Sequence, residues 1–338
     1  MQFERRAIFF PGTRECDWQT STPETSADKV LLKARLSGIS AGTEGMWFDG
    51  SASALKSGRK SYPYFPGYEF VGEVVSVGAD VTADPGRFPR LSKLGPGDRV
   101  FAFKPHAGAN EITEADMWVR LDASVDDADA LALALCTTGI HAVHRGAPTA
   151  GSSAAVFGLG TMGLTLIQTL AAIGSGDIVA VTSSPDKADM AKRFGATHVV
   201  SLEDVRAGKP GAPLADTVYE CSGSVAVLGD SLSLCAPQGT VVAAGFYNDP
   251  MVLDGELMFS RELTVKSVRA TGAASPRNEF LRWPRAENLD MAATLLKRGK
   301  LVSDGLVTHR VKPEDMPGAY AMIVDRTEPF LQVAVDWS

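Results

Sequence analysis

The sequence predicts an α/β protein in which a mainly β first part is followed by a doubly wound parallel sheet. Short β-type runs fill the first part, apolar strands alternate with single helices from about residue 127, and a glycine-rich turn joins one of these strands to a helix. A chain of 338 residues is too long for one ordinary core and suits two domains. We therefore predict two domains, with a boundary near residue 125.

The first domain, residues 1–125, is expected to be mainly β. Runs rich in β-branched and other apolar residues cover 29–40, 70–78 and 98–103. Turn signals such as the GPGD segment at 95–98 separate these runs. This pattern is typical of a small domain built from short strands.

The second domain, residues 126–271, is expected to contain a parallel sheet. Helix-type segments separate most of its apolar strands, which implies βαβ units. The expected strands are AAVF (154–157), DIVAVTSS (177–184), THVVSLE (197–203), DTVYECSG (216–223) and GTVVAAGFY (239–247). The segment ADALALALCTTGIHAVHRGA is expected to be helical, and two more helices are expected at 288–300 and from about 313 to 325.

Composition and charge exclude several classes of protein. The chain is 45% apolar and 22% charged, with a net charge of -7 and no basic stripe, so we expect no nucleic-acid partner. No window of 18 apolar residues is present, and MQFERRAIFF lacks the apolar stretch of a signal peptide, so we expect no membrane association. The four cysteines are scattered, which fits a reducing cytoplasm.

The strongest local motif is GLGTMG at 158–163, between an apolar strand and an apolar helix. Gly158 permits the tight turn, Gly160 lets a pyrophosphate approach the backbone, and Gly163 lets helix and strand pack closely. Together with Thr161 and Met162 these residues are predicted to bind a dinucleotide at the helix N-terminus. The alternative is a purely structural turn between strand and helix.

The end of the next strand indicates which dinucleotide binds. An NAD site usually has an acidic residue here, about 20 residues beyond the glycine motif, to bind the ribose hydroxyls. This chain instead has Thr182, Ser183 and Ser184, with Lys187 shortly after them. Hydroxyls and an ammonium group accept a 2′-phosphate that a carboxylate would repel, so we predict NADP(H). Ser184 can also simply cap the next helix, and the two roles are compatible.

Taken together, these segments resemble the medium-chain dehydrogenase/reductase superfamily, which includes zinc alcohol dehydrogenases and quinone oxidoreductases. The markers occur in the family's order along nearly the whole chain. They are SGISAGTE (37–44), FPGYEFVGEVVSVG (65–78), GPGDRVF (95–101), TTGIHAV (137–143), GLGTMG (158–163), AKRFGATHVV (191–200), YECSGS (219–224) and LVTHRVKPEDMPGAYAMI (306–323).

The resemblance implies a GroES-like β domain and a Rossmann domain. The GroES-like domain would be formed by residues 1–125 and completed by 272–338, and the Rossmann domain would span 126–271. Within the family, SGISAGTE most resembles the subgroup similar to bacteriochlorophyllide a dehydrogenase. A homodimer is also expected.

The same resemblance places the family's zinc ligands on residues that bind zinc poorly. The cysteine position is Ser40, the histidine position is Tyr68, and Cys136 lies out of register with the third ligand. The stretch 79–122 has no cysteine for a structural zinc. We therefore predict no metal at either site, and we expect the retained acids of the two motifs, Glu44 and Glu69, to be structural.

Without zinc, other polar groups must stabilise the developing oxyanion and relay a proton. Thr43 matches the family's hydroxyl that binds the substrate oxygen. Tyr68 either donates to a carbonyl oxygen or fills the vacated space. His106 is a candidate proton relay, since its ordinary pKa is near neutrality, or else an exposed loop residue. The aromatic segment 46–65 either walls an apolar substrate pocket or belongs to the core.

The predicted cofactor site includes four residues from later strands. Cys221 follows the strand that contains YECSGS, and Gly245, Phe246 and Tyr247 follow another strand, where they are expected to border the nicotinamide.

The favoured function is a zinc-independent, NADPH-dependent oxidoreductase that transfers a hydride to or from a C=O or CH–OH group of a small or medium apolar substrate. The alternative is a reductase of an activated C=C bond, similar to quinone and enoyl reductases. A non-catalytic dinucleotide-binding protein is a third reading, against which the intact nucleotide motif argues.

Overall fold

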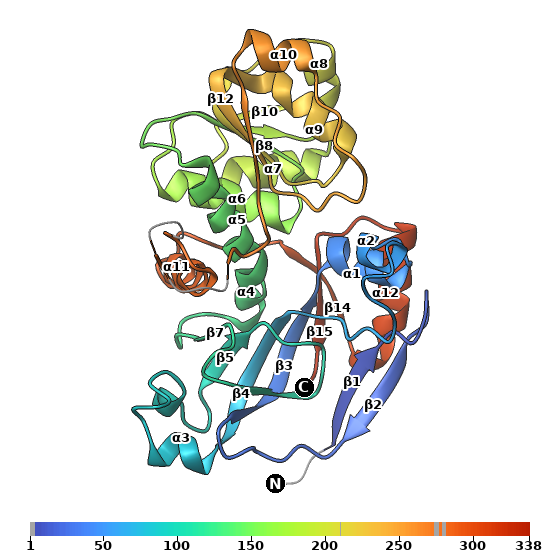
Figure 1. Cartoon of the computed structure of the whole chain (residues 1–338), viewed down its shortest axis with the longest axis vertical. Helices are drawn as coiled ribbons and strands as arrows, with labels where there is room; N and C mark the ends of the chain where they lie inside the picture. Colours follow the sequence, from blue (N-terminus) through green and yellow to red (C-terminus); the bar gives the residue numbers. More distant parts are fainter. Residues whose placement is uncertain (1–3, 210, 274–276, 279–281) are drawn as a thin grey trace. The chain divides into compact units, whose positions relative to one another are not determined.

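The computed structural model describes residues 4–209, 211–273, 277–278 and 282–338 (Figure 1). The chain forms two units. One unit contains the residues up to Ala134 together with Ser303–Ser338, and the other is Leu135–Val302. The predicted boundaries were near 125 and 272, whereas this division lies after Ala134 and after Val302. The later boundary differs because helix α11 (Arg285–Lys297) belongs to the second unit and not to the first.

The first unit contains a seven-stranded sheet with the order β14-β15-β3-β4-β5-β7, in which β6 also pairs with β3. All of its pairs are antiparallel except β14 with β15. Its strands are β3 (Val30–Ile39), β4 (Glu69–Val77), β5 (Arg99–Ala102), β6 (Ala109–Ile112), β7 (Trp118–Arg120), β14 (Val307–Val311) and β15 (Gln332–Asp336). A separate antiparallel pair is formed by β1 (Arg5–Phe9) and β2 (Asp17–Ser21).

Short helices and 3₁₀ turns lie between these strands. They are α1 (Ala41–Phe48), α2 (Ser53–Lys56), α3 (Ala79–Ala83), the 3₁₀ turns η1 (Leu91–Lys93) and η3 (Pro313–Asp315), α4 (Asp127–Leu131) and α12 (Met316–Asp325). Helices α1 and α12 contribute to one apolar core with β15. The pairing of β3 with β15 and β4 therefore carries SGISAGTE, the GYE segment and the C-terminal strand to one place in the sheet.

The second unit has a six-stranded parallel sheet with the order β10-β9-β8-β11-β12-β13. Numbered from its first strand, this is the order 3-2-1-4-5-6 of a Rossmann fold, so the predicted α/β class with a parallel and an antiparallel sheet is confirmed. The strands are β8 (Ala154–Phe157), β9 (Ile178–Val181), β10 (His198–Val200), β11 (Ala215–Glu220), β12 (Cys235–Ala243) and β13 (Thr264–Ser267).

The helices of this unit follow most of the predicted segments. They are α5 (Leu133–Gly146), α6 (Thr161–Ala172), α7 (Pro185–Arg193), α8 (Leu202–Arg206), α9 (Val225–Ser231) with the 3₁₀ turn η2 (Leu232–Leu234), α10 (Gly255–Ser260) and α11. The predicted strand THVVSLE ends at Val200, because Ser201 caps α8 by accepting a hydrogen bond from the Asp204 backbone. The predicted helix before the glycine motif is two helices, α4 and α5.

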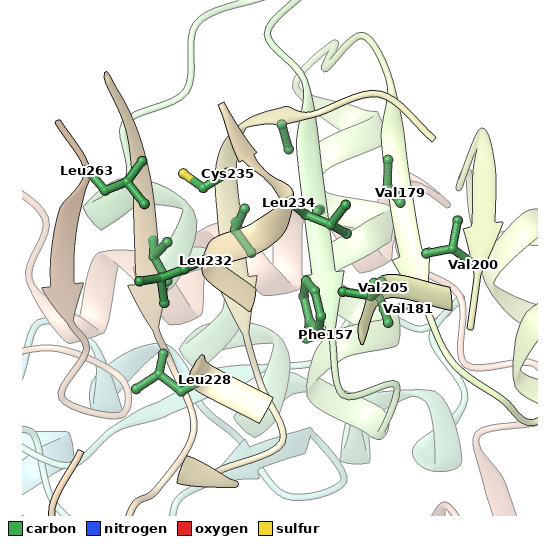
Figure 2. Packing of buried hydrophobic residues seen from close by; sticks show 14 of the residues in the cluster. Phe157, Val179, Val181, Val200, Val205, Leu228, Leu232, Leu234, Cys235 and Leu263 are labelled. Atoms are coloured by element: carbon green, nitrogen blue, oxygen red, sulfur yellow. The ribbon is translucent and has the colours of Figure 1, made fainter. Parts of the chain in front are cut away.

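A single apolar cluster fills one face of the parallel sheet (Figure 2). It includes Phe157 from β8, Val179 from β9, Val200 from β10 and Leu228 from α9, all at least nine-tenths buried. Strands β8 and β9 are buried at every position, as expected for a parallel sheet covered on both faces. The sheet is thereby a rigid base for the loops at the carboxyl ends of its strands.

No helix within the described part of the chain is long and apolar enough to cross a membrane.

Candidate functional site

The loop between β8 and α6 has the geometry of a dinucleotide-binding turn. Gly158 has a φ of +83°, and a Cβ atom here would lie 2.5 Å from the backbone nitrogen of Ser222. A Cβ at Gly163 would lie 2.2 Å from the carbonyl oxygen of Gly158. The Cβ position of Gly160 has no neighbour within 4 Å among the described residues. The turn is thus tightly packed on its protein side and open at Gly160, where a pyrophosphate must approach the backbone.

Helix α6 presents its N-terminus to the same place. Gly160 is its N-cap residue, and its first turn, which starts with Thr161, Met162 and Gly163, carries no acidic side chain. The first N–H groups of a helix have no partner within the helix and attract anions. These residues fit the diphosphate of a nicotinamide dinucleotide, which they would hold through backbone N–H groups.

The end of β9 carries hydroxyl groups and no carboxylate. The Thr182 hydroxyl accepts a hydrogen bond of 3.1 Å from the backbone N–H of Ser184. Ser184 is the N-cap residue of α7, but its side chain makes no capping hydrogen bond. Ser183 is exposed, Lys187 lies in the first turns of α7, and Asp186 is the only acid in the first turn of that helix.

The loops that follow β11 and β12 touch each other. A Cβ at Gly245 would lie 2.3 Å from the backbone nitrogen of Gly223. The Tyr247 hydroxyl donates to the buried Glu220 carboxylate at the end of β11. Phe246 is 56% exposed. Burial raises the pKa of the Cys221 thiol, and the nearby Glu220 carboxylate raises it further.

The first unit gathers three hydroxyl groups, which we call the hydroxyl cluster: Ser40, Thr43 and Tyr68. Ser40 follows β3 and is the N-cap residue of α1, Thr43 lies in the first turn of α1, and Tyr68 immediately precedes β4. They meet because Gly38 of β3 pairs with Glu69 of β4. The Tyr68 hydroxyl donates a hydrogen bond to Ser40 Oγ, and the Thr43 side chain also hydrogen-bonds to the phenol.

Burial raises the pKa of Tyr68. The hydrogen bonds of the phenol with Ser40 and Thr43 act in the opposite direction but do not reverse the shift. The phenol is therefore neutral around pH 7 and can donate a hydrogen bond. Its ring stacks with Phe103 at a centroid distance of 6.3 Å, which orients the hydroxyl.

His106 lies in the interior behind this cluster and is fully buried, so it is not an exposed loop histidine. Its Nε2 is 3.0 Å from Glu44 Oε2, and its Nδ1 is 2.8 Å from Ser37 Oγ. A Cβ at Gly67, whose φ is +103°, would lie 2.7 Å from the imidazole ring. Only glycine at position 67 leaves room for this histidine.

Glu44 connects the buried histidine to the hydroxyl cluster. Its Oε1 accepts a hydrogen bond of 3.0 Å from the backbone N–H of Ser40. Its Oε2 also accepts a hydrogen bond of 2.6 Å from the Tyr320 hydroxyl of α12. The position of Ser40 thus depends on a carboxylate that His106 and Tyr320 hold in place. The sequence did not reveal Tyr320, because it lies 276 residues away from Glu44 along the chain.

Glu69, the second retained acid, is also fully buried. Its Oε2 accepts a hydrogen bond of 2.7 Å from Gln332 Nε2, whereas its Oε1 has no partner among the described residues. Burial raises the pKa of this carboxyl well above 4.5, and the bond from Gln332 only partly opposes that shift. Glu69 therefore keeps its proton to a higher pH than an exposed glutamate does.

These residues do not fit a catalytic zinc ion. The hydroxyls of Ser40 and Tyr68 bond to each other, Tyr68 resists ionisation, and Glu69 has a raised pKa. Zinc ligands must instead be deprotonated thiols or carboxylates, or neutral imidazoles. In the part of the chain that the structure describes, no group of three or more His, Cys, Asp and Glu residues could hold a metal ion.

The remaining candidates belong to the core. Trp47 stacks on Tyr64 at 4.1 Å in the apolar cluster of the first unit, and the Tyr62 hydroxyl donates to the Trp47 carbonyl oxygen. Trp47, Phe48, Tyr62 and Tyr64 thus belong to the core of the first unit, whereas Phe65 is 39% exposed. Cys136 is fully buried in α5, and burial raises its pKa to about 12.

Comparisons with known proteins agree with this architecture. The family model described as zinc-binding dehydrogenase matches residues 161–289. A 2-desacetyl-2-hydroxyethyl bacteriochlorophyllide A dehydrogenase of Rhodobacter capsulatus is 29% identical over 91% of this chain and 90% of its own. The 5-exo-hydroxycamphor dehydrogenase of Pseudomonas putida is 24% identical over 96% of each chain.

The fold is shared with solved dehydrogenase structures. Galactitol-1-phosphate dehydrogenase from Escherichia coli superposes with a TM-score of 0.79 and 21% identity, over 98% of this chain and 99% of that chain. The chain is therefore similar to dehydrogenases of the medium-chain dehydrogenase/reductase superfamily, among them bacteriochlorophyllide a dehydrogenases, and shares their fold.

Proposed function

We propose that this chain transfers a hydride between NADP(H) and a C=O or CH–OH group of a small or medium apolar substrate, without zinc. The observation that carries the proposal is the hydroxyl cluster: Ser40 and Tyr68 stand at the positions where the family resemblance puts zinc ligands, and Thr43 stands where it puts the hydroxyl that binds the substrate oxygen. Neutral hydroxyls there can perform the task of a Lewis acid, because they can donate hydrogen bonds to an oxygen that becomes negatively charged.

When bound, the nicotinamide supplies or accepts the hydride. In reduction, the substrate carbon gains that hydride and its oxygen gains a proton. The Tyr68 hydroxyl, which stays protonated because burial raises its pKa, donates a hydrogen bond to this oxygen while negative charge develops on it, and a proton from solvent then neutralises the alkoxide. Rotation of the hydroxyl hydrogens lets Ser40 donate to Tyr68 while Tyr68 donates to the substrate. Thr43 serves as the second donor.

In this proposal His106 does not touch the substrate. Together with Tyr320 it holds the Glu44 carboxylate, which accepts the backbone N–H of Ser40 and so fixes the start of α1. His106 is therefore a positioning residue, and a proton from it would have to pass through Glu44.

The preference for NADP(H) rests on the end of β9. Thr182, Ser183 and Ser184 offer hydroxyl donors, and Lys187 offers a positive charge, for a 2′-phosphate. We expect NADPH to bind at least about tenfold more tightly than NADH, a difference of roughly 1.4 kcal/mol. Titration of the purified protein with both cofactors measures this difference, and equal affinities would contradict the preference.

Chemistry at CH–OH is favoured over reduction of C=C bonds because two of the relatives are named as dehydrogenases of hydroxyl-bearing compounds, a hydroxycamphor and a hydroxyethyl bacteriochlorophyllide. The test is to incubate the protein with NADPH and panels of ketones and enones and to identify the products. A saturated ketone from an enone would indicate the C=C alternative, whereas an alcohol supports the proposal.

A homodimer is part of the proposal. The second unit offers a surface for a second copy of the chain. Its parallel sheet ends in the edge strand β13, and the side chains of Val252 and Phe259 are 74% and 87% exposed. Light scattering after size-exclusion chromatography gives the mass, and a monomer at micromolar concentration would contradict it.

A further inference from the structure

Glu220 occupies a special place in the parallel sheet. In a Rossmann fold of this strand order, each half of the sheet binds one mononucleotide, at the carboxyl ends of its strands. Strands β8, β9 and β10 form the half that carries the glycine motif, and β11, β12 and β13 form the other half. Glu220 is the last residue of β11, so it lies at the start of the nicotinamide half.

The Glu220 carboxylate is fully buried and accepts hydrogen bonds from four donors. Its Oε1 accepts from the Ser222 backbone N–H at 2.7 Å and from the Ser222 hydroxyl. Its Oε2 accepts from the Gly223 backbone N–H at 3.2 Å and from the Tyr247 hydroxyl. Each carboxyl oxygen of Glu220 therefore has two hydrogen-bond donors, which fix its orientation.

These bonds join two loops from different strands. Ser222 and Gly223 follow β11, whereas Tyr247 follows β12. The two loops pack closely at their glycines. A Cβ at Gly223 would lie 2.7 Å from the Phe246 carbonyl oxygen, and a Cβ at Gly245 would lie 3.1 Å from Glu220 Oε2. Glu220 thus holds both loops in one rigid wall.

This wall also contacts the glycine motif. The nearest atom to a Cβ at Gly158 is the Ser222 backbone nitrogen, and the Ser222 N–H is the one that Glu220 holds. The carboxylate therefore orders the point where the two halves of the sheet meet, which is the topological switch point at which such sheets bind ligands.

We infer that Glu220, with Tyr247 as its partner, is a positioning residue that shapes the nicotinamide half of the cofactor site and leaves the adenosine half unaffected. This inference rests on the proposed function, since it requires a nicotinamide dinucleotide at this sheet. It assigns a role to a buried acid that does not touch substrate, and to the Tyr247 hydroxyl as the group that ties the second loop to the first.

The experiment compares binding of the whole cofactor with binding of its adenosine half. The wild type, Glu220→Gln and Tyr247→Phe are titrated with NADPH, NADH and adenosine 2′,5′-bisphosphate, with AMP as the fragment for NADH. Asp230→Asn is the matched control, because Asp230 forms a distant surface ion pair of 2.7 Å with Arg206 in the same unit. Thermal unfolding is measured for every variant, and the rate of hydride transfer at saturating cofactor for each active one.

Tyr247→Phe keeps the carboxyl group and removes one hydrogen bond to it. We expect it to weaken binding of the preferred dinucleotide by about tenfold, and Glu220→Gln to weaken it more, while fragment affinity changes by less than about twofold. The hydride-transfer rate of Tyr247→Phe should fall as well, because saturation with cofactor does not restore the wall. Asp230→Asn should match the wild type.

Full dinucleotide affinity in a folded Tyr247→Phe would overturn the inference and leave the proposed function intact. Equal losses for dinucleotide and fragment in that variant would also overturn it, because they indicate a general structural defect. A wild-type protein that binds neither NADPH nor NADH would contradict the proposed function and the inference together. If Glu220→Gln does not fold, Tyr247→Phe alone decides.

Discussion

The nucleotide loop of the second unit and the hydroxyl cluster of the first differ in which part of the chain forms them. The nucleotide loop is made by backbone, and its glycines are required because a Cβ at Gly158 or Gly163 would overlap neighbouring backbone atoms. The hydroxyl cluster is made by side chains whose positions depend on buried partners, above all Glu44. A backbone site restricts residue types within a few positions, whereas a side-chain site depends on residues scattered along the chain.

The largest effect is expected at the backbone site. Gly163→Val should abolish cofactor binding and destabilise the second unit, because its Cβ would lie 2.2 Å from the Gly158 carbonyl oxygen. Gly160→Ala is the matched control for stability, since the space around its Cβ is open. It should keep a wild-type melting temperature and still lose dinucleotide affinity by at least about tenfold, because its methyl group occupies the path of the pyrophosphate. Calorimetry and cofactor titration separate the two effects, and a Gly163→Val protein with normal affinity would contradict the assignment.

At the side-chain site, Tyr68→Phe should slow hydride transfer by about ten- to a thousandfold, which corresponds to roughly 1.4–4 kcal/mol of transition-state stabilisation. Cofactor affinity should change little, because Tyr68 belongs to the first unit and not to the nucleotide loop. Single-turnover kinetics measure the rate. A fully active Tyr68→Phe would mean that the phenol only fills space, and Thr43 would then become the better donor.

Cofactor choice gives a smaller expected effect. Thr182→Asp places a carboxylate at the end of β9, where it would repel a 2′-phosphate and could bind ribose hydroxyls. We expect the ratio of NADPH to NADH affinity to fall by about tenfold or more. Ser201→Asp, beyond the next strand, tests whether any added acid has this effect. An unchanged ratio in Thr182→Asp would place the 2′-phosphate elsewhere.

A further effect concerns the stability of the first unit. The folded protein keeps a proton on Glu69 that the unfolded chain releases above about pH 4.5, because burial raises the pKa of this carboxyl. The free energy of unfolding should therefore fall as the pH rises above that value, by up to about 1.4 kcal/mol per pH unit. Glu69→Gln removes this proton and should flatten the dependence. Urea unfolding at pH 5, 6, 7 and 8 measures both slopes, and parallel slopes for the two proteins would contradict a raised pKa of Glu69.

Sequence patterns predicted the nucleotide unit well because its requirements are local. The apolar strands, the GLGTMG turn and the alternation of helices each follow from a few neighbouring residues. The prediction was wrong where two local signals compete. Ser201 lies in a segment with strand propensity, but it caps α8 and so ends the strand early. The tail after 272 was assigned to the first domain because the family resemblance suggested it, whereas α11 belongs to the second unit.

The candidate site of the first unit was only partly visible in the sequence. The resemblance brought Ser40, Thr43 and Tyr68 to notice, but not the partners that hold them. Tyr320 and Gln332 contact Glu44 and Glu69 across more than 260 residues of chain, and no local pattern marks such contacts. For Glu220 the sequence did contain a signal that was not used. An acid that ends a buried strand beside a glycine turn needs partners that compensate for its burial.

The proposed chemistry requires that neutral hydroxyls replace a metal ion at Ser40 and Tyr68. Elemental analysis of the purified protein, combined with activity assays before and after treatment with a chelator, tests it most directly. If hydroxyl groups replace the metal, the protein contains no stoichiometric zinc, and the chelator and added zinc leave its activity unchanged. One tightly bound zinc ion per chain, with activity that is lost on chelation and restored by zinc, would contradict it.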